Sequence, residues 1–412
     1  MAKQNEKKRA LEPELRFPEF NEEWEEENLG RLFKHRQEQG DEDLPLLSLT
    51  AEKGIIPQSE SGRKDNSNAD KSRYLRVAKG DIAYNTMRMW EGRSALSSLE
   101  GLVSPAYTVC APRSKADSTF FSHYIKTASL IELFNRNSQG LTKDTYSLKF
   151  PSFAKIRVHL PELPEQQKIA DCLGSLDDLI AAHSAKLDAL QDHKKGLLQQ
   201  LFPAEGETTP KLRFPGFEGE WGETQLGKIV SFQSGGTPSK ANSAFWEGTI
   251  PWVSAKDMKH LFLEDAQDHI SQTAIDNGAK VAPRGSVLIL IRGMTLFKDV
   301  PICVLEKPMS FNQDVKALRA KAGLEQKFLP FLLLGNKRRM LGLVDSAGHG
   351  TGRIDTEELK ALFIFFPKSA EQQKIAACLT SLDGLISAET NQIAALKTHK
   401  KALMQQLFPS PE

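Results

Sequence analysis

The sequence predicts two mixed α/β (α+β) domains, each followed by a long helix, with the two helices packed together as an antiparallel coiled coil. Three observations lead to this fold class. The six residues EQQKIA occur twice in the 412-residue chain, at 165–170 and 371–376. Apolar residues then recur at heptad spacing behind each copy. Strand-like and helix-like runs are mixed in the long stretches that precede the two copies.

The repeat extends over most of the chain. LRFP at 15–18 recurs at 212–215, an offset of 197 residues, and a Trp and a Leu-Gly pair follow each copy. EQQKIA and the later QQLFP recur with an offset of 206 residues. Between these repeated ends the halves differ: YNTMRMWEGR (84–93) has no evident copy in the second half, and SGGTPSK (234–240) has none in the first.

Two similar frames therefore hold two different inserts. This pattern predicts that the frames share one mechanical role and that each insert fits a different target. The alternative is an old duplication whose loops have drifted apart. We divide the chain into an N-terminal segment (1–27), a first insert (28–163), a first spacer helix (164–203), a connector (204–224), a second insert (225–367) and a second spacer helix (368–409).

Both inserts mix the two kinds of secondary structure. Bulky and β-branched runs predict buried strands at 103–112, 156–161, 286–292 and 362–367. Helical periodicity predicts amphipathic helices at 120–136 and 327–343.

The two long helices are predicted by apolar steps of four and three that continue for about five heptads. A helix from 165 to 201 is roughly 55 Å long, and prolines flank both helices. We call the line of residues that faces the partner helix the seam. Its predicted members are Ile169, Leu173, Leu176, Ile180, His183, Leu187, Leu190 and Leu197 in the first helix, and Ile375, Leu379, Leu382, Ile386, Glu389, Ile393, Leu396 and Leu403 in the second.

Chain order predicts that the helices are antiparallel. The first helix ends where the connector enters the second insert, and the second helix begins where that insert ends. The equivalent residues His183 and Glu389 lie near the helix centres and are expected to face each other as a charge-assisted pair across a pseudo-twofold axis. Lys194 and Lys400 interrupt the seam near its outer ends, where we expect them to reach solvent. The Glu-Gln-Gln faces are expected to meet partner subunits.

A formal net charge of +1 conceals strong local differences. Residues 61–160 carry 16 Lys and Arg against 8 Asp and Glu, residues 225–366 carry 18 against 14, and residues 1–60 carry 9 against 15. Phosphate binding depends on the local field, so both inserts suit DNA. Arg can donate to guanine, Asn to adenine, and Lys and hydroxyls to phosphate. The candidate DNA-binding residues are Arg63, Lys64, Arg73, Asn85, Arg88, Arg93 and Lys143 in the first insert, and Thr237, Ser239, Lys240, Arg292, Lys337, Arg338, Arg339 and Arg353 in the second.

Several function classes lack their motifs. The glycine-rich segments do not fit a P-loop, and neither GxSxG nor HExxH occurs. The Asn/Asp-Pro-Pro-aromatic motif expected of an adenine amino-methyltransferase is also missing. The four cysteines form no CxxC pair, so we expect no metal site and a reducing, cytoplasmic location. No apolar run reaches the length of a membrane span.

The doubled EQQKIA helix that ends in QQLFP resembles the specificity subunit of type I restriction-modification enzymes. LRFP with its Trp and Leu-Gly, SGGTPS followed by IPWVS, and KGDIAYNTMR followed by GLVSPAY resemble segments of the target-recognition domains of that family. The resemblance covers nearly the whole chain after about residue 13. It transfers no particular base-contacting residue, because those segments vary within the family.

The resemblance implies that each insert binds one half of a split sequence in double-stranded DNA, while the helix pair fixes the gap. It implies two methyltransferase (modification) subunits as partners, which bind S-adenosylmethionine and methylate adenine. Restriction subunits, which use ATP and Mg²⁺, join them, and this chain itself has no cofactor and no catalytic residues. Two other hypotheses remain: a coiled-coil scaffold whose inserts bind proteins, and an enzyme with an unrecognised nuclease site around Glu358.

Overall fold

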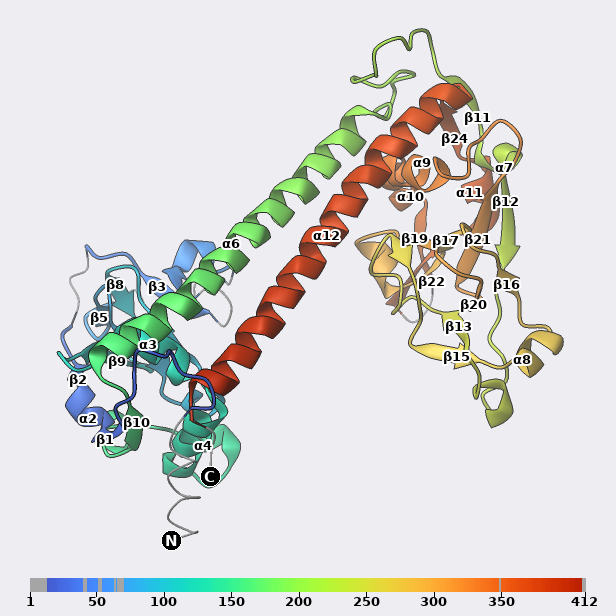
Figure 1. Ribbon diagram of the computed structural model, residues 1–412. Helices are drawn as coiled ribbons and strands as arrows, with labels where there is room; N and C mark the ends of the chain where they lie inside the picture. The colour runs from blue at the N-terminus through green and yellow to red at the C-terminus, as the bar shows by residue number, and fades with distance from the viewer. Residues whose placement is uncertain are drawn as a thin grey trace. The chain divides into compact units, whose positions relative to one another are not determined.

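The computed structural model describes residues 13–39, 43–50, 54–62, 64, 70–347 and 350–409 (Figure 1). The chain forms two compact units: unit 1 is Met1–Ala185 with Asn391–Glu412, and unit 2 is Lys186–Thr390. Each unit contains one mixed domain and one end of each long helix. These helices are α6 (Leu163–Gln200) and α12 (Ser369–Leu407).

The helices lie close to their expected ranges, with α6 at Leu163–Gln200 against 164–203 and α12 at Ser369–Leu407 against 368–409. Each has a glutamate in its first turn, which suits the positive end of the helix dipole. Pro164 lies inside the first turn of α6, where a missing N–H costs nothing. All predicted seam residues are buried or half-buried. Leu179 and Leu385, which lie off the seam at equivalent positions, are 43% and 52% exposed.

An ion pair joins α6 to α12 in each unit, and in unit 2 the pairs Lys194–Asp383 and Lys186–Glu389 run in opposite directions along the two helices, as an antiparallel arrangement requires. In unit 2, Lys194 Nζ lies 2.5 Å from Asp383 Oδ1. In unit 1, Lys400 Nζ lies 2.5 Å from Asp177 Oδ1. The expectation that both lysines reach solvent is wrong: their side chains are only 14% and 18% exposed. Each ammonium group instead pairs across the helices, because an unpaired buried charge is costly.

The polar positions near the helix centres are also paired. Glu389 is 8% exposed, and its Oε1 lies 2.5 Å from Lys186 Nζ on α6. His183 is half-buried. The proposed pairing of His183 with Glu389 stays a prediction.

The first mixed domain is built around the antiparallel sheet β2-β9-β6-β7. Its strands are β2 (Phe33–Arg36), β9 (Tyr107–Pro112), β6 (Ile82–Asn85) and β7 (Ser94–Leu96). Three further strand pairs are β1 (Glu25–Asn28) with β10 (Arg157–Leu160), β3 (Leu47–Thr50) with β4 (Gly54–Pro57), and β5 (Leu75–Val77) with β8 (Gly101–Val103). The helical elements are α2 (Leu29–Leu32), η1 (Gln58–Glu60), η2 (Met89–Glu91), α3 (Ser118–Tyr124), α4 (Ala128–Asn137), η3 (Lys143–Thr145) and α5 (Phe150–Phe153).

The second mixed domain follows the same plan with an added strand. Its main sheet is β12-β21-β17-β19-β14, from β12 (Val230–Ser234), β21 (Val315–Ala320), β17 (Val287–Leu290), β19 (Ile302–Leu305) and β14 (Phe262–Leu263). A second sheet has the order β15-β13-β20-β16, from β15 (Asp268–Ile270), β13 (Ile250–Val253), β20 (Met309–Phe311) and β16 (Val281–Ala282). The remaining strands are β18 (Arg292–Gly293), β23 (Thr351–Ile354) and β22 (Val344–Ala347) in one sheet, and β11 (Gly222–Gln225) paired with β24 (Phe363–Phe366).

The helices of this domain are short: α7 (Leu226–Ile229), η4 (Ser243–Phe245), α8 (Gln272–Asp276), η5 (Met294–Phe297), α9 (Leu329–Gly335), α10 (Lys337–Leu341) and α11 (Thr356–Ala361). The single helix expected at 120–136 is two helices, α3 and α4, and the one expected at 327–343 is also two, α9 and α10. In the first domain the break falls at Thr127, whose side chain caps α4 by accepting from Leu130 N. In the second, Asn336 separates α9 from α10.

The repeated motifs hold the helix ends in place. Arg16 of the first LRFP donates two hydrogen bonds of 2.8 Å to Glu165. Arg213 of the second LRFP donates to Glu371 at 2.9 and 2.7 Å. Both carboxylates are 3% exposed, and such forked pairs are strong and geometrically specific. The leucine before each arginine contacts the last turn of the other long helix. Leu15 N donates to Gln406 O of α12, and Leu212 N donates to Gln200 O of α6, both at 2.9 Å.

The next residue of EQQKIA ties each helix to its own mixed domain. Gln166 accepts from Asp117 N at 3.0 Å and donates to Lys115 O and Pro161 O. Gln372 makes the same three bonds, with Glu325 N, Gly323 O and Pro367 O. The expectation that the Glu-Gln-Gln faces meet partner subunits is wrong for the Glu and the first Gln, which are at most 2% exposed in both copies.

The two cores are closed by the far ends of the helices. Leu407 and Phe408, at the end of α12, belong to the core of unit 1, where Phe408 stacks on Tyr124 at 4.9 Å. Leu201 and Phe202, just after α6, belong to the core of unit 2. Burying a phenylalanine side chain contributes about 2 kcal/mol, so each QQLFP segment is a structural anchor.

Candidate nucleic-acid interface

The loop after β6 and the loop after β17 occupy the same place in the two domains. Each connects equivalent neighbouring strands of the main sheet, β6 to β7 and β17 to β19. Each carries a short 3-10 helix, η2 or η5, and an exposed methionine, Met87 or Met294. YNTMRMWEGR therefore does have a counterpart in the second half, LIRGMTLFKD. The topology reveals it, because the two sequences have diverged.

In the first domain three of the predicted residues meet at this loop. Asn85, Arg88 and Arg93 line one cavity of about 270 Å³ together with Leu49 and Tyr107. Both arginines are about half exposed, and Asn85 is half-buried. The cavity thus combines two cations and an amide at the end of a strand, an arrangement suited to a polar, electron-rich ligand.

The predicted Lys143 lies on a neighbouring hairpin, within η3. Its Nζ is 5.8 Å from the centre of the Trp90 ring, over which it lies. Tyr146 of the same hairpin contacts Trp90 edge to face at 6.0 Å. These contacts pack the hairpin against η2, so Lys143 is held near the cavity loop.

The basic segment between β4 and β5 contributes less than its sequence indicates. Lys64 and Arg73 are exposed, and neither lines the cavity. Arg63 lies outside the described residues. Arg76, which ends this segment, is held in a charge network at the surface of the domain.

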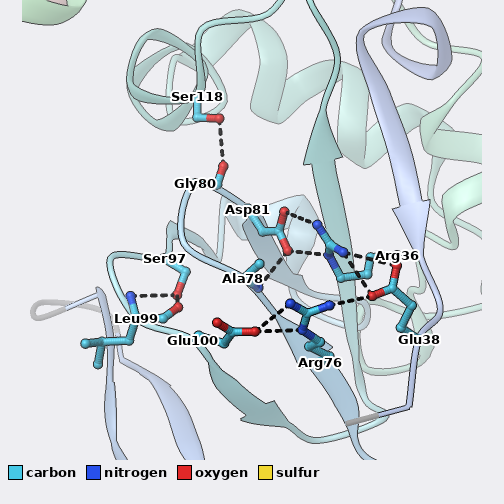
Figure 2. A network of polar contacts seen from close by, with 10 residues as sticks. All are labelled: Arg36, Glu38, Arg76, Ala78, Gly80, Asp81, Ser97, Leu99, Glu100 and Ser118. Carbon is cyan, nitrogen blue, oxygen red and sulfur yellow. Dashed lines mark hydrogen bonds and ion pairs between the residues drawn. The ribbon is translucent and has the colours of Figure 1, made fainter.

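Figure 2 shows that network. Arg36 on β2 donates to Asp81 at 2.6 Å, and Arg76 on β5 donates to Glu100 at 2.8 Å. Glu38 accepts from both arginines at 3.0 to 3.1 Å. Arg36 lowers the pKa of Glu38, chiefly through its charge. Three carboxylates therefore balance two guanidinium groups, which makes these arginines structural rather than available for phosphate.

In the second domain, Thr237, Ser239 and Lys240 are exposed on the loop that follows β12. Thr237 Oγ1 donates to Gln313 Oε1 at 2.5 Å. Two tryptophans hold the loop from behind, with Trp252 Nε1 donating to Gly236 O and Trp246 Nε1 to Ser239 O. The loop is thus tied to one buried indole, Trp252, and one half-buried indole, Trp246, while Thr237 and Ser239 remain exposed.

Arg292 and Arg353 lie opposite each other on β18 and β23. Both are exposed, and Arg353 donates to Asp355 at 3.3 Å. Ile291 N donates to Asp314 O at 2.8 Å, which joins this hairpin to the turn that carries Gln313. Arg292 and Arg353 therefore lie on a hairpin that is hydrogen-bonded to the turn at Gln313 and Asp314, and Gln313 in turn contacts the loop after β12.

The basic cluster on α10 is more internal than predicted. Lys337 lies 2.5 Å from Asp299, and Arg339 donates to Asn336 at 3.2 Å. Both side chains are half-buried, whereas Arg338 is exposed. Two of these three residues thus have partners within the domain.

Sequence reasoning missed three residues in these loops: Glu91, Tyr107 and Gln313. Glu91 bears the wrong charge for a DNA contact, and the others lie outside the basic segments. Glu91 lies in the same loop as the two arginines that it contacts. Tyr107 is brought to the site by the pairing of β6 with β9, and Gln313 by its hydrogen bond with Thr237. Among the described residues there is no group of three or more His, Cys, Asp or Glu that could hold a metal ion. None of the described helices is long and apolar enough to cross a membrane.

Comparison with known proteins gives a consistent result. The family model described as "Type I restriction modification DNA specificity domain" matches twice, at residues 21–192 and 218–398. The specificity subunit of the Escherichia coli type I restriction enzyme EcoR124I/EcoR124II is 30% identical over 243 residues, which cover 57% of each chain. The MjaVIII specificity subunit of Methanocaldococcus jannaschii is 22% identical over 358 residues, or 82% of each chain.

Solved structures share the fold. The S subunit of a type I restriction-modification system from M. genitalium superposes with a TM-score of 0.63, at 16% identity, over 97% of this chain and 100% of that chain. A chain from another type I system gives 0.54 at 18% identity, over 94% and 98%.

The aligned region spans only about half of the first two curated relatives, 57% of the E. coli protein and 44% of the M. jannaschii MjaIX specificity subunit. The family model, however, covers most of this chain in two copies. The chain therefore belongs to the type I restriction-modification DNA specificity family.

Proposed function

We propose that this chain is the DNA sequence-specificity subunit of a type I restriction-modification complex, in which each mixed domain binds one half of a bipartite site. The observation that carries the proposal is the match of the DNA specificity domain to both halves of the chain. The similar frames and dissimilar polar loops support it, since two different half-sites need two different binding surfaces on one scaffold.

The test is a map of methylated adenines in DNA treated with the full chain and its methyltransferase partner. We expect a split recognition sequence with a fixed gap. Replacing residues 28–163 with those of another family member should change one half of that sequence only. DNA binding without sequence preference, or a change in both halves, would overturn the proposal.

We further propose that α6 and α12 set the gap between the half-sites. Both helices run without interruption for 38 and 39 residues, and two half-sites on one face of DNA are spaced by turns of about 34–36 Å. Inserting seven residues after both Ala182 and Ala388, which are equivalent, preserves the heptad and lengthens the pair by about 10 Å. The gap should grow by about three base pairs at 3.4 Å each, with both half-sites unchanged. An unchanged gap would contradict this role.

The partners are proposed to be two methyltransferase subunits, joined by restriction subunits. Leu179 and Leu385 are large apolar side chains exposed at equivalent positions of α6 and α12, so two copies of one partner can meet the same residue. Leu179→Glu should reduce the bound methyltransferase from two copies to one, and the double variant with Leu385→Glu to none, as measured by native mass spectrometry. Leu99→Glu, at an exposed leucine of the first mixed domain, is the control and should retain both.

The chemistry belongs to the partners in this proposal. S-adenosylmethionine would be bound by the methyltransferase subunits, and ATP with Mg²⁺ by the restriction subunits, while this chain supplies binding alone. The four cysteines are unpaired, which agrees with the proposed cytoplasmic location.

A further inference from the structure

The cavity of the first mixed domain presents hydrogen-bond donors. Asn85 and Tyr107 are partners in the β6–β9 register, and they form one wall. Arg88 and Arg93 come from the loop that leaves β6. Their arrangement is specific enough to identify a chemical class of ligand.

Asn85 is oriented by its own loop. Its Oδ1 accepts a hydrogen bond from Met87 N at 3.0 Å, as asparagine does in turns, while Asn85 N donates to Arg93 O at 2.9 Å. The amide therefore directs its oxygen to the backbone and retains its NH₂ group for a ligand. Adenine needs a donor and an acceptor from the same amide, so this orientation disfavours an Asn85–adenine pair.

Glu91 holds both arginines. Its Oε1 accepts from Arg88 Nη1 at 3.0 Å, and its Oε2 accepts from Arg93 Nε at 3.3 Å. Among the contacts described for this loop, Arg93 gives a side chain only its Nε hydrogen, which leaves the two terminal nitrogens as a fork. That fork matches the O6 and N7 acceptors of guanine in the major groove.

The loop that carries these residues is stiff. Gly92 has φ of +74°, which allows the turn between Glu91 and Arg93, and a Cβ at this position would lie 3.0 Å from Ile131 Cδ1. Trp90 Nε1 donates to Met87 O at 3.0 Å. A pre-ordered arginine loses less conformational entropy when it binds a base.

We propose that this cavity binds the major-groove edge of a guanine in the first half-site. Arg93 is the forked donor, Asn85 adds a donor, and Glu91 is a positioning residue that acts through the arginines. This inference rests on the proposed function and names the base that one domain binds. A DNA phosphate offers the same acceptor chemistry, so the test must separate the two sources.

The test selects preferred sites from a randomised DNA pool with the full chain bound to its methyltransferase partner. Arg93→Ala should reduce the preference for guanine at one position of the first half-site by about 5- to 150-fold, the range for one forked arginine–base pair. Glu91→Gln should weaken discrimination at that same position. Arg136→Ala is the control, because Arg136 is exposed, is paired with Glu132 on the same helix and does not line the cavity, and it should change nothing.

Retained preference in the second half-site shows that each variant is folded, and Arg93→Lys provides a milder change for the same comparison. If Arg93→Ala weakens binding to all sequences equally and lowers the salt dependence, Arg93 binds phosphate and the guanine assignment is wrong. Unchanged preference at every position would overturn it too. A wild-type complex without any sequence preference would overturn the proposed function as well.

Discussion

Unit 1 and unit 2 repeat each other at the helix ends and differ next to them. The Arg16–Glu165 and Arg213–Glu371 pairs have the same forked geometry and the same exposures, 18% for each arginine and 3% for each glutamate. The cross-helix pairs Lys400–Asp177 and Lys194–Asp383 are both 2.5 Å long. The frame has therefore been kept contact by contact while the loops that face outward have changed.

The difference begins one side chain away from the cross-helix pairs. In unit 1, His123 on α3 has its Nε2 3.7 Å from Asp177 Oδ2. In unit 2, the matching place on α9 is taken by Phe331, whose ring centre is 6.0 Å from Lys194 Nζ. The two cross-helix ion pairs have the same length, but the pair in unit 1 has a titratable neighbour and the pair in unit 2 an aromatic one. The two halves should respond alike to loss of the frame and differently to pH.

The largest expected effect tests the likeness. Arg16→Met and Arg213→Met each leave a buried carboxylate without its partner, which costs about 3 kcal/mol. We expect equal losses of protection against hydrogen exchange at the start of α6 in the first variant and of α12 in the second. If only one variant lost protection, the Arg16–Glu165 and Arg213–Glu371 pairs would not contribute equally to stability.

The next effect, acid sensitivity, should separate the units. Burial lowers the pKa of His123 to about 4, and the charge of Lys400 contributes in the same direction. The unfolded chain, with a histidine pKa near 6.5, binds more protons than the folded chain between these values. The folded chain is therefore not destabilised by His123 above pH 6.5. As the pH falls from 6.5 toward 4, this one residue lowers the free energy of unfolding, by about 2 kcal/mol at pH 5.

Hydrogen exchange measured separately on α3 and α9 checks this prediction. Lowering the pH from 7 to 5 should weaken protection of α3, after correction for intrinsic exchange rates, more than protection of α9. His123→Phe, which copies the residue of unit 2, should remove the excess. An equal response of α3 in the variant and the wild type would exclude His123 as the source.

The smallest effect concerns the cross-helix lysines. Lys194→Met strands Asp383, which is 10% exposed and whose pKa burial already raises, so protonation limits the cost to about 1 to 2 kcal/mol. Lys400→Met strands Asp177, which is 47% exposed, and should cost less than 1 kcal/mol. Thermal unfolding of both variants shows which substitution lowers stability more. A larger loss for Lys400→Met would contradict the prediction that burial of the stranded aspartate sets the cost.

The sequence predicted the frame because periodicity and repetition are local signals. Heptad spacing located α6 and α12 to within a few residues, and chain order indicated their antiparallel direction. It could not predict the Arg16–Glu165 pair, whose members are 149 residues apart. Nor could it predict that Lys194 would pair with Asp383, because a lysine on a seam can either extend to solvent or find a carboxylate on the facing helix.

The candidate site was predicted in part for a similar reason. Arg88 and Arg93 were found from composition, since clustered cations near aromatics are visible in one dimension. Glu91 was missed because its role depends on the two arginines that it contacts. The equivalence of the loops after β6 and β17 depends on strand order, which neither loop's sequence contains.

The placement of Phe408 has a consequence for synthesis on the ribosome. Unit 2 is a continuous stretch, Lys186–Thr390, so all of its residues are available before the chain is finished. Unit 1 needs Leu407 and Phe408 to fill its core, although its first residues are made before any of unit 2. Unit 1, whose synthesis begins first, is therefore expected to complete its fold last. Until Leu407 and Phe408 are made, the apolar side chains that they cover stay exposed, and a chaperone can bind there.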